Sequence, residues 1–332
     1  MPGTSNTPDK VETTAKVDTT KVVQKTKLVK RTPVVLIFGP TAVGKTALLQ
    51  APVFSNAEII NADSMQVYRG MDIGTAKPDP DFLARVKHHL IDIRDPHEQF
   101  HAGDFVELAD EITEKISNRG KIPVICGGTG FYFKNFIYGL PEAPPADEVI
   151  RKRLQSELEE SGSEPLVEHL QQVDPVSAAR INRNDNYRIL RALEVYEASG
   201  RPLSDYALPE KPRAQYETLL IGLNRGREEL YERINLRVEL MFDLGVEAEV
   251  AALRKGGCTD TDPGMKGIGY REFFTAEKEG LDSDELRELI KRNSRRYAKR
   301  QITWFRQLES INWFSPEDIT GISDCVDEFL KG

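Results

Sequence analysis

Short apolar runs alternate with longer amphipathic segments through much of this sequence. The apolar runs predict strands, and the segments with apolar residues every three or four positions predict helices. The expected strands are 34–38, 58–61, 89–93, 122–126, 218–223 and 311–314, and the expected helices are 45–50, 81–87, 102–118, 227–255 and 283–306. Strands that alternate with helices through short turns imply a parallel sheet covered on both faces, so we expect an α/β fold.

The pattern changes at the Pro-rich stretch 141–145. Residues 147–200 show helical periodicity and no strand pattern, and a second Pro-containing stretch, 202–213, closes this segment. We therefore predict an all-helical subdomain inserted into the α/β domain. The expected domains are a core of 32–140 and 215–316, a helical insertion of 141–214 and a C-terminal segment of 317–332. Residues 1–31 have no aromatic residue and no sustained periodicity, so we expect a disordered tail there.

Composition limits the class of protein. With 332 residues, 39% hydrophobic and 30% charged, the chain can bury a sizeable core. No apolar stretch approaches the roughly 20 residues that cross a bilayer, and the N-terminus has no apolar signal core, so we expect a cytoplasmic protein without membrane contact. The three cysteines, Cys126, Cys258 and Cys325, form no Cys-x-x-Cys pair, which argues for a reducing compartment and against a structural zinc site.

A phosphate-binding loop follows the first strand. It consists of Gly39, Pro40, Thr41, Ala42, Val43, Gly44, Lys45 and Thr46. In such a loop, backbone N–H groups and the dipole of the next helix form a site for phosphate, and Lys45 and Thr46 supply an ammonium and a metal-facing hydroxyl. The chain is therefore expected to have a P-loop NTPase-like sheet and to bind a phosphorylated small molecule.

Two further strand ends carry polar groups. Asp63 follows the second strand, and Thr129 follows Gly127 and Gly128 at the end of the fourth. In an open α/β sheet these carboxyl ends line one ligand crevice beside the phosphate-binding loop. Asp63 there is either a metal ligand, a base or a helix-capping residue. Together, the three strand ends indicate transfer of a group from a phosphorylated donor.

The predicted helix 283–306 is strongly basic, although the whole chain has a net charge of −8. Against the single acid Glu288 it carries Arg287, Lys291, Arg292, Arg295, Arg296, Lys299, Arg300 and Arg306, and its apolar stripe is formed by Leu286, Ile290, Tyr297 and Trp304. Solvated helix faces usually mix both signs of charge. The pattern therefore favours contact with a nucleic-acid backbone over a merely solvated face.

An ordered set of motifs resembles the tRNA dimethylallyltransferase family. The motifs occupy residues 39–46, 59–78, 88–92, 127–132, 267–272 and 299–306, and the resemblance spans about 33–315. The chain is similar to the bacterial-type members of this family, because it ends without the C-terminal zinc finger of many eukaryotic relatives. One departure is the segment 47–54, in which Pro52 is expected to shorten the helix that follows the loop.

The resemblance implies transfer of a dimethylallyl group from its diphosphate to N6 of adenosine 37 in the tRNA anticodon stem-loop. Asp63 matches the family's general base, Thr129 the residue that hydrogen-bonds the oxygen between prenyl group and diphosphate, and Arg237 an additional diphosphate-binding residue. Lys45 and a Mg²⁺ ion held partly by Thr46 would stabilise the departing diphosphate. Arg237 also fits the pattern of an ordinary surface arginine.

The resemblance also implies tRNA-contacting residues. They are Asp63, Ser64, Met65, Gln66, Tyr187, Arg188, Ile189, Leu190, Arg191, Lys266, Gly267, Ile268, Gly269, Tyr270, Arg271, Lys299, Arg300, Gln301, Ile302, Thr303, Trp304, Phe305 and Arg306. For Tyr187 and Trp304, packing in a core is an equal alternative to stacking on a base. A monomer is expected.

Three other activities stay open. A prenyltransferase acting on free AMP or ATP is the nearest, and the basic helix argues for RNA over a free nucleotide. A small-molecule kinase or an RNA-binding ATPase would also use the loop, but both need a metal-binding aspartate at a strongly apolar strand, which is poorly formed here.

Overall fold

The computed structural model describes residue 3, residues 31–206 and residues 209–331. Apart from Gly3 and Arg31, the predicted tail lies outside these ranges. The described chain contains a six-stranded sheet in the order β3-β2-β4-β1-β5-β6, and every neighbouring pair is parallel. The strands are β1 (Thr32–Phe38), β2 (Ala57–Ala62), β3 (His88–His89), β4 (Ile122–Gly127), β5 (Tyr216–Leu223) and β6 (Asn312–Phe314). The α/β class predicted from the sequence is confirmed.

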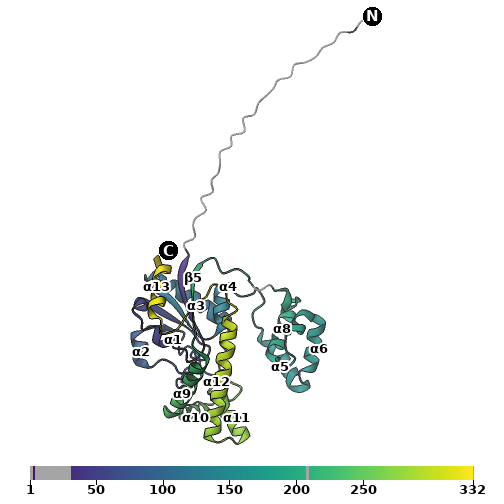
Figure 1. Ribbon diagram of the computed structural model, residues 1–332. Coiled ribbons are helices and arrows are strands. Elements are labelled where there is room, and N and C mark those ends of the chain that lie inside the picture. Colours follow the sequence, from purple (N-terminus) through teal and green to yellow (C-terminus); the bar gives the residue numbers. More distant parts are fainter. Residues whose placement is uncertain (1–2, 4–30, 207–208, 332) are drawn as a thin grey trace. The chain divides into compact units, whose positions relative to one another are not determined.

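Figure 1 shows the helices of the described ranges. They are α1 (Lys45–Leu48), α2 (Pro80–Arg85), α3 (Ala102–Asn118), α4 (Gly130–Tyr138), α5 (Glu148–Ser161), α6 (Glu164–Val173), α7 (Pro175–Arg180), α8 (Asn186–Ser199), α9 (Arg227–Asp243), α10 (Val246–Lys255), α11 (Arg271–Glu279), α12 (Ser283–Phe305) and α13 (Ile319–Lys331). Single 3₁₀ turns occupy Pro52–Phe54, Leu203–Asp205 and Gly264–Lys266.

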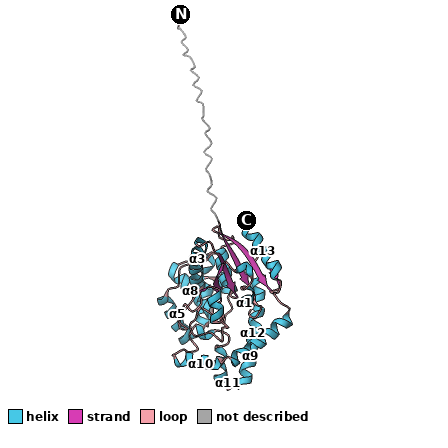
Figure 2. Cartoon of the chain, turned by 90° about the vertical axis from the view of Figure 1, so that its left-hand side faces the viewer, coloured by secondary structure: helices cyan, strands magenta, loops and turns pink. Residues whose placement is uncertain are grey.

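Two apolar layers cover the sheet. Alternate residues of β1 face opposite sides: Val34, Leu36 and Phe38 pack with side chains of α3 and α4, whereas Val35 and Ile37 pack with side chains of α1 and α13. Figure 2 shows α3 and α13 on opposite sides of the strands. Because β1 is buried on both faces, its sequence is a continuous apolar run rather than an alternating one.

The helices α5 to α8 lie within the predicted insertion and have an apolar cluster of their own, which includes Leu154, Leu166 and Leu193. A fully buried carboxylate on α8, Glu194, accepts the Asp147 N–H at 2.6 Å and pairs with Arg151 and Arg191. The insertion is therefore stabilised by its own core and by a buried charge network at the point where the chain enters it.

Three expectations need correction. The strand predicted at 89–93 is limited to His88–His89, because Leu90 and Asp92 adopt positive φ values of 63° and 56° that end the extended backbone. The helical segment 227–255 is two helices, separated at Gly245 with φ 92°. The helices α4, α11 and α13 were not predicted.

The shortened helix after the phosphate-binding loop is confirmed. α1 ends at Leu48, and Pro52 begins the 3₁₀ turn that follows. Leu48, Leu49 and Phe54 are nevertheless buried against the sheet, so apolar packing anchors the short segment.

Candidate functional site

The phosphate-binding loop lies between β1 and α1. Ala42 and Gly44 adopt positive φ values of 63° and 118°, the alternation that forms an anion-binding concavity. The first-turn N–H groups of α1 have no acceptor within that helix. Two carbonyl groups of the loop accept hydrogen bonds from arginines: Val43 O accepts Arg225 Nε at 2.7 Å, and Ala42 O accepts Arg233 Nε at 2.9 Å.

Lys45 lies within this concavity. Its ammonium group donates to Gly39 O and Pro40 O, both at 2.9 Å. Burial lowers the pKa of Lys45 to about 8, and the negative charge of Asp63 acts in the opposite direction. The charge on Lys45 is therefore sensitive to pH in the weakly alkaline range.

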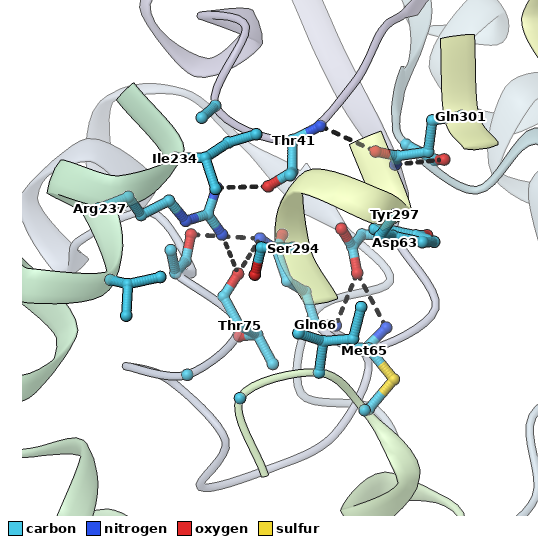
Figure 3. Close-up of a pocket in the computed structure, with 18 of the residues that line it drawn as sticks. Thr41, Asp63, Met65, Gln66, Thr75, Ile234, Arg237, Ser294, Tyr297 and Gln301 are labelled. Atoms are coloured by element: carbon cyan, nitrogen blue, oxygen red, sulfur yellow. Dashed lines mark hydrogen bonds between the residues drawn. The ribbon is translucent and has the colours of Figure 1, made fainter. Parts of the chain in front are cut away.

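Asp63 and the phosphate-binding loop line one cavity of about 560 Å³. Asp63 Oδ1 accepts the N–H groups of Met65 at 2.9 Å and Gln66 at 3.4 Å (Figure 3). These two bonds use one carboxylate oxygen and set the direction of the side chain at the end of β2. A carboxylate and an anion-binding loop therefore line the same cavity.

Arg237, on α9, lines the same cavity and contacts the phosphate-binding loop. Its Nη1 donates to Thr41 Oγ1 and its Nη2 to Thr75 O, each at 3.0 Å (Figure 3). Burial lowers its pKa from the ordinary value and Asp63 opposes that effect. An arginine held by two protein acceptors in a cavity fits a binding group better than a surface residue.

Gln301, on α12, bridges two of the loops. Its Oε1 accepts the Thr41 N–H at 2.9 Å, and its Nε2 donates to Gly128 O at 2.8 Å. The side chain is almost fully buried, and a Cβ at Gly128 would lie 2.4 Å from its Nε2. The amide of Gln301 therefore connects the phosphate-binding loop to the turn after β4. Because Gln301 also lines the cavity, its contact with tRNA stays a prediction.

Thr129 immediately precedes α4. Its Oγ1 accepts the Ser64 N–H at 3.0 Å, next to Asp63. Its neighbours Gly128 and Ser64 line the cavity, but Thr129 is not among the lining residues. The contact with donor oxygen that the resemblance implies stays a prediction, and the bond to Ser64 gives Thr129 a role in holding the Asp63 loop.

Most of the remaining residues predicted to contact tRNA fall into three groups. The cavity is lined by Ser64, Met65, Gln66, Lys266, Gly267, Ile268, Gly269, Arg271 and Arg300. A second cavity, of about 1290 Å³ between the core and the insertion, is lined by Tyr187, Arg188, Arg191 and Trp304. Lys299, Thr303 and Arg306 are exposed on α12.

Five other residues predicted to contact tRNA have side chains that pack inside the protein. Ile189 and Leu190 belong to the core of the insertion, and Tyr270 and Phe305 are fully buried in the core domain. Ile302 packs against the apolar layer that includes α1. Four of these side chains are buried and Ile302 is half-buried, and the contact of the five residues with tRNA stays a prediction.

The basic helix α12 has two kinds of positive charge. Arg287 and Lys291 pair with Glu239 of α9 at 2.9 and 2.5 Å, so that end of the helix is neutralised within the protein. Lys299 and Arg306 are exposed near its other end. The net positive surface is therefore shorter than the sequence pattern implied.

Three residues of the site were not anticipated. Arg225 and Arg233 bind the loop carbonyls, and Tyr297 lines the cavity. Burial and, secondarily, Asp63 raise the pKa of Tyr297, which keeps its hydroxyl protonated. Arg233 lies one helical turn before Arg237 on α9, a spacing that could have indicated it. For Tyr297, the sequence offers only its place on the apolar stripe of α12, which does not indicate a site residue.

Few side chains of the described residues are grouped so that they could bind a metal ion. In the part of the chain that the structure describes, no three His, Cys, Asp or Glu side chains are grouped to hold an ion. Mg²⁺ in phosphate sites usually takes one or two protein ligands and completes its shell with phosphate oxygens and water. Thr46, which lines the cavity with Asp63, fits this pattern. Within the same described ranges, every helix is too short or too polar to cross a membrane.

Comparisons of sequence agree on one family. A family model described as IPP transferase matches residues 66–308, a range that begins after Asp63. The tRNA dimethylallyltransferase of Geobacter sulfurreducens is 44% identical over 300 residues, which cover 90% of this chain and 96% of that protein. The tRNA dimethylallyltransferase of Syntrophobacter fumaroxidans is 46% identical over 292 residues, covering 87% and 85%.

Comparisons of structure agree with the sequence. The full-length tRNA isopentenylpyrophosphate transferase from Bacillus halodurans has a TM-score of 0.66 and 38% identity, covering 91% of this chain and 99% of that one. A eukaryotic dimethylallyltransferase acting on tRNA has a TM-score of 0.70 and 28% identity, covering 82% and 69%.

Proposed function

Because this chain belongs to the IPP transferase family, we propose that it is a tRNA dimethylallyltransferase that prenylates N6 of adenosine 37 from dimethylallyl diphosphate. The observation that carries the proposal is the shared cavity of Asp63 and the phosphate-binding loop. The loop, Lys45 and Arg237 would bind the diphosphate, and Asp63 would act on the acceptor amine. A reaction between an amine and an allylic diphosphate needs both groups at one site.

The reaction forms a carbon–nitrogen bond and breaks the allylic carbon–oxygen bond. The amine is a weak nucleophile because its lone pair is delocalised into the purine, so Asp63 accepts its proton as attack proceeds. Diphosphate leaves with the electron pair of the broken bond. The loop N–H groups, Lys45 and Arg237 stabilise the charge that it gains.

Mg²⁺ is the metal that this site would use. Thr46 would hold it together with oxygens of the diphosphate. When bound, the ion supplies positive charge that neutralises the leaving group.

The tRNA would occupy the second cavity and the exposed end of α12. Lys134, Arg180 and Arg188 line that cavity together with the aromatic side chains of Tyr187 and Trp304. Positive charge suits a phosphate backbone, and aromatic rings suit unpaired bases. Base extrusion, which costs a few kcal/mol, would bring adenosine 37 from this cavity to Asp63.

A single assay separates the candidate activities. Purified protein is incubated with labelled dimethylallyl diphosphate and either unmodified tRNA, AMP or ATP, and the label on each acceptor is counted. We expect label on tRNA alone. Equal labelling of AMP would indicate an adenylate prenyltransferase, and phosphoryl transfer from ATP without prenylation would indicate a kinase.

Asp63→Asn tests the general base. Because the amide cannot accept the proton, we expect kcat to fall by about 10²–10⁴-fold, while KM for dimethylallyl diphosphate changes less than threefold. Asp81→Asn makes the same change at an exposed position of α2 and should match the wild type. Full turnover by Asp63→Asn would exclude this role.

A further inference from the structure

A carboxylate outside the cavity holds one of the cavity's loops. Glu249, on α10, accepts three successive backbone N–H groups: Asp72 at 2.8 Å and Ile73 at 2.7 Å on Oε2, and Gly74 at 3.0 Å on Oε1. Oε1 also accepts the Tyr270 hydroxyl at 2.6 Å. Each oxygen of the carboxylate therefore binds two donors.

Tyr270 completes the support of this loop. Its side chain is fully buried, and a Cβ at Gly74 would lie 2.5 Å from its ring, so only glycine fits there. Burial and the neighbouring Glu249 raise the pKa of the Tyr270 hydroxyl, which keeps it a hydrogen-bond donor. The Tyr270 ring, from a distant part of the chain, thus explains the glycine at position 74 of the motif at 59–78.

The same loop supplies acceptors to the cavity. Thr75 O accepts Arg237 Nη2 at 3.0 Å and Gln66 Nε2 at 3.2 Å, and Ala76 O accepts Gln66 Nε2 at 3.2 Å (Figure 3). Arg237 in turn donates to Thr41 in the phosphate-binding loop. The backbone of residues 72–75 therefore connects the hydrogen bonds of Glu249 to those of Arg237 and the phosphate-binding loop.

We propose that Glu249 is a positioning residue for the transfer reaction, which acts through residues 72–76 to hold Arg237 against the phosphate-binding loop. The inference rests on the proposed function, in which Arg237 binds the donor diphosphate. Glu249 itself does not line the cavity. Its effect is to fix the Thr75 carbonyl, so its loss misplaces Arg237 without removing any group that contacts the substrate.

Glu249→Gln is a sharp test because the side chain keeps its size. Four donors point at the carboxylate, and either orientation of the amide sets an NH₂ group against two of them. We expect KM for dimethylallyl diphosphate and Kd for inorganic pyrophosphate to rise about 10-fold. Glu247→Gln, an exposed position on the same helix, should leave both values unchanged.

Tyr270→Phe is the milder variant in case Glu249→Gln unfolds the protein. It removes one of the four donors, so we expect Kd for pyrophosphate to rise about threefold. Unchanged pyrophosphate affinity in folded samples of both variants would overturn the inference.

A double-mutant cycle with Arg237→Gln tests the route of the effect. If Glu249 acts through Arg237, adding Glu249→Gln to Arg237→Gln should change Kd for pyrophosphate by less than twofold. Additive losses would show another route and overturn the inference. A wild-type protein that binds pyrophosphate but transfers no prenyl group to tRNA would instead contradict the proposed function.

Discussion

At the scale of single residues, Lys45 makes pyrophosphate binding sensitive to pH. Its pKa is lowered from 10.5 to about 8 in the free protein, and only the charged form attracts diphosphate. Raising the pH from 7 to 9 therefore removes most of the charge, and we expect the affinity for pyrophosphate to fall up to about 10-fold relative to Lys45→Arg. Calorimetric titration at several pH values measures this.

Lys45→Arg is the matched control for that titration. Arginine stays charged throughout, so this variant reports how the ionisation of pyrophosphate itself changes binding. Parallel pH profiles for the two proteins would contradict a lowered pKa at Lys45.

At the scale of elements, the two ends of α12 should respond differently to charge removal. Lys299 and Arg306 are exposed, so Lys299→Gln and Arg306→Gln should each raise Kd for tRNA about threefold or more and reduce the salt slope of binding by about one. Filter binding across a salt series measures both quantities.

Arg287→Gln is the control from the same helix. Because Arg287 pairs with Glu239, we expect unchanged tRNA affinity and a loss of at most about 1 kcal/mol in unfolding free energy. A tRNA defect in Arg287→Gln as large as that in Lys299→Gln would show that the whole helix contacts RNA.

At the scale of the whole molecule, the buried carboxylate of Glu58 makes the free energy of unfolding depend on pH. Glu58 of β2 binds His89 and Arg119 at 2.7 Å and Lys121 at 3.0 Å. Burial alone would raise the pKa of Glu58, but hydrogen bonds from His89 and Lys121 and the charge of Lys87 lower it from 4.5 to about 2. Its stabilising effect is therefore present above pH 4.5 and lost as the pH falls towards 2.

Glu58→Gln should lower the unfolding free energy by about 2 kcal/mol at pH 7. The difference from the wild type should shrink between pH 4.5 and pH 2. Urea unfolding at several pH values measures it, with Glu217→Gln at an exposed strand position as the control. A difference that persists unchanged at pH 2 would contradict the lowered pKa.

The sequence predicted the parts of the fold and site that depend on local pattern. The strand run 34–38 and the phosphate-binding loop are local signals, and both lie where the pattern indicated. Contacts between distant segments were not readable: Gln301 meets Thr41 across 260 positions, and Glu249 meets Asp72 across 177. The shortened β3 has the same origin, because Asp92 bonds Lys77 and tertiary contacts override strand propensity.

The position of β4 between β1 and β2 has a consequence for changing the donor. The phosphate-binding loop and Asp63 follow strands two inter-strand spacings apart, roughly 10 Å, and that span is a property of the backbone. Side-chain engineering cannot lengthen it. Redesign for a bulkier isoprenoid must instead enlarge the cavity by smaller side chains at Val238 and Met241 of α9. The phosphate-binding loop and Asp63 stay in place because the hydrogen bonds between the strands hold them.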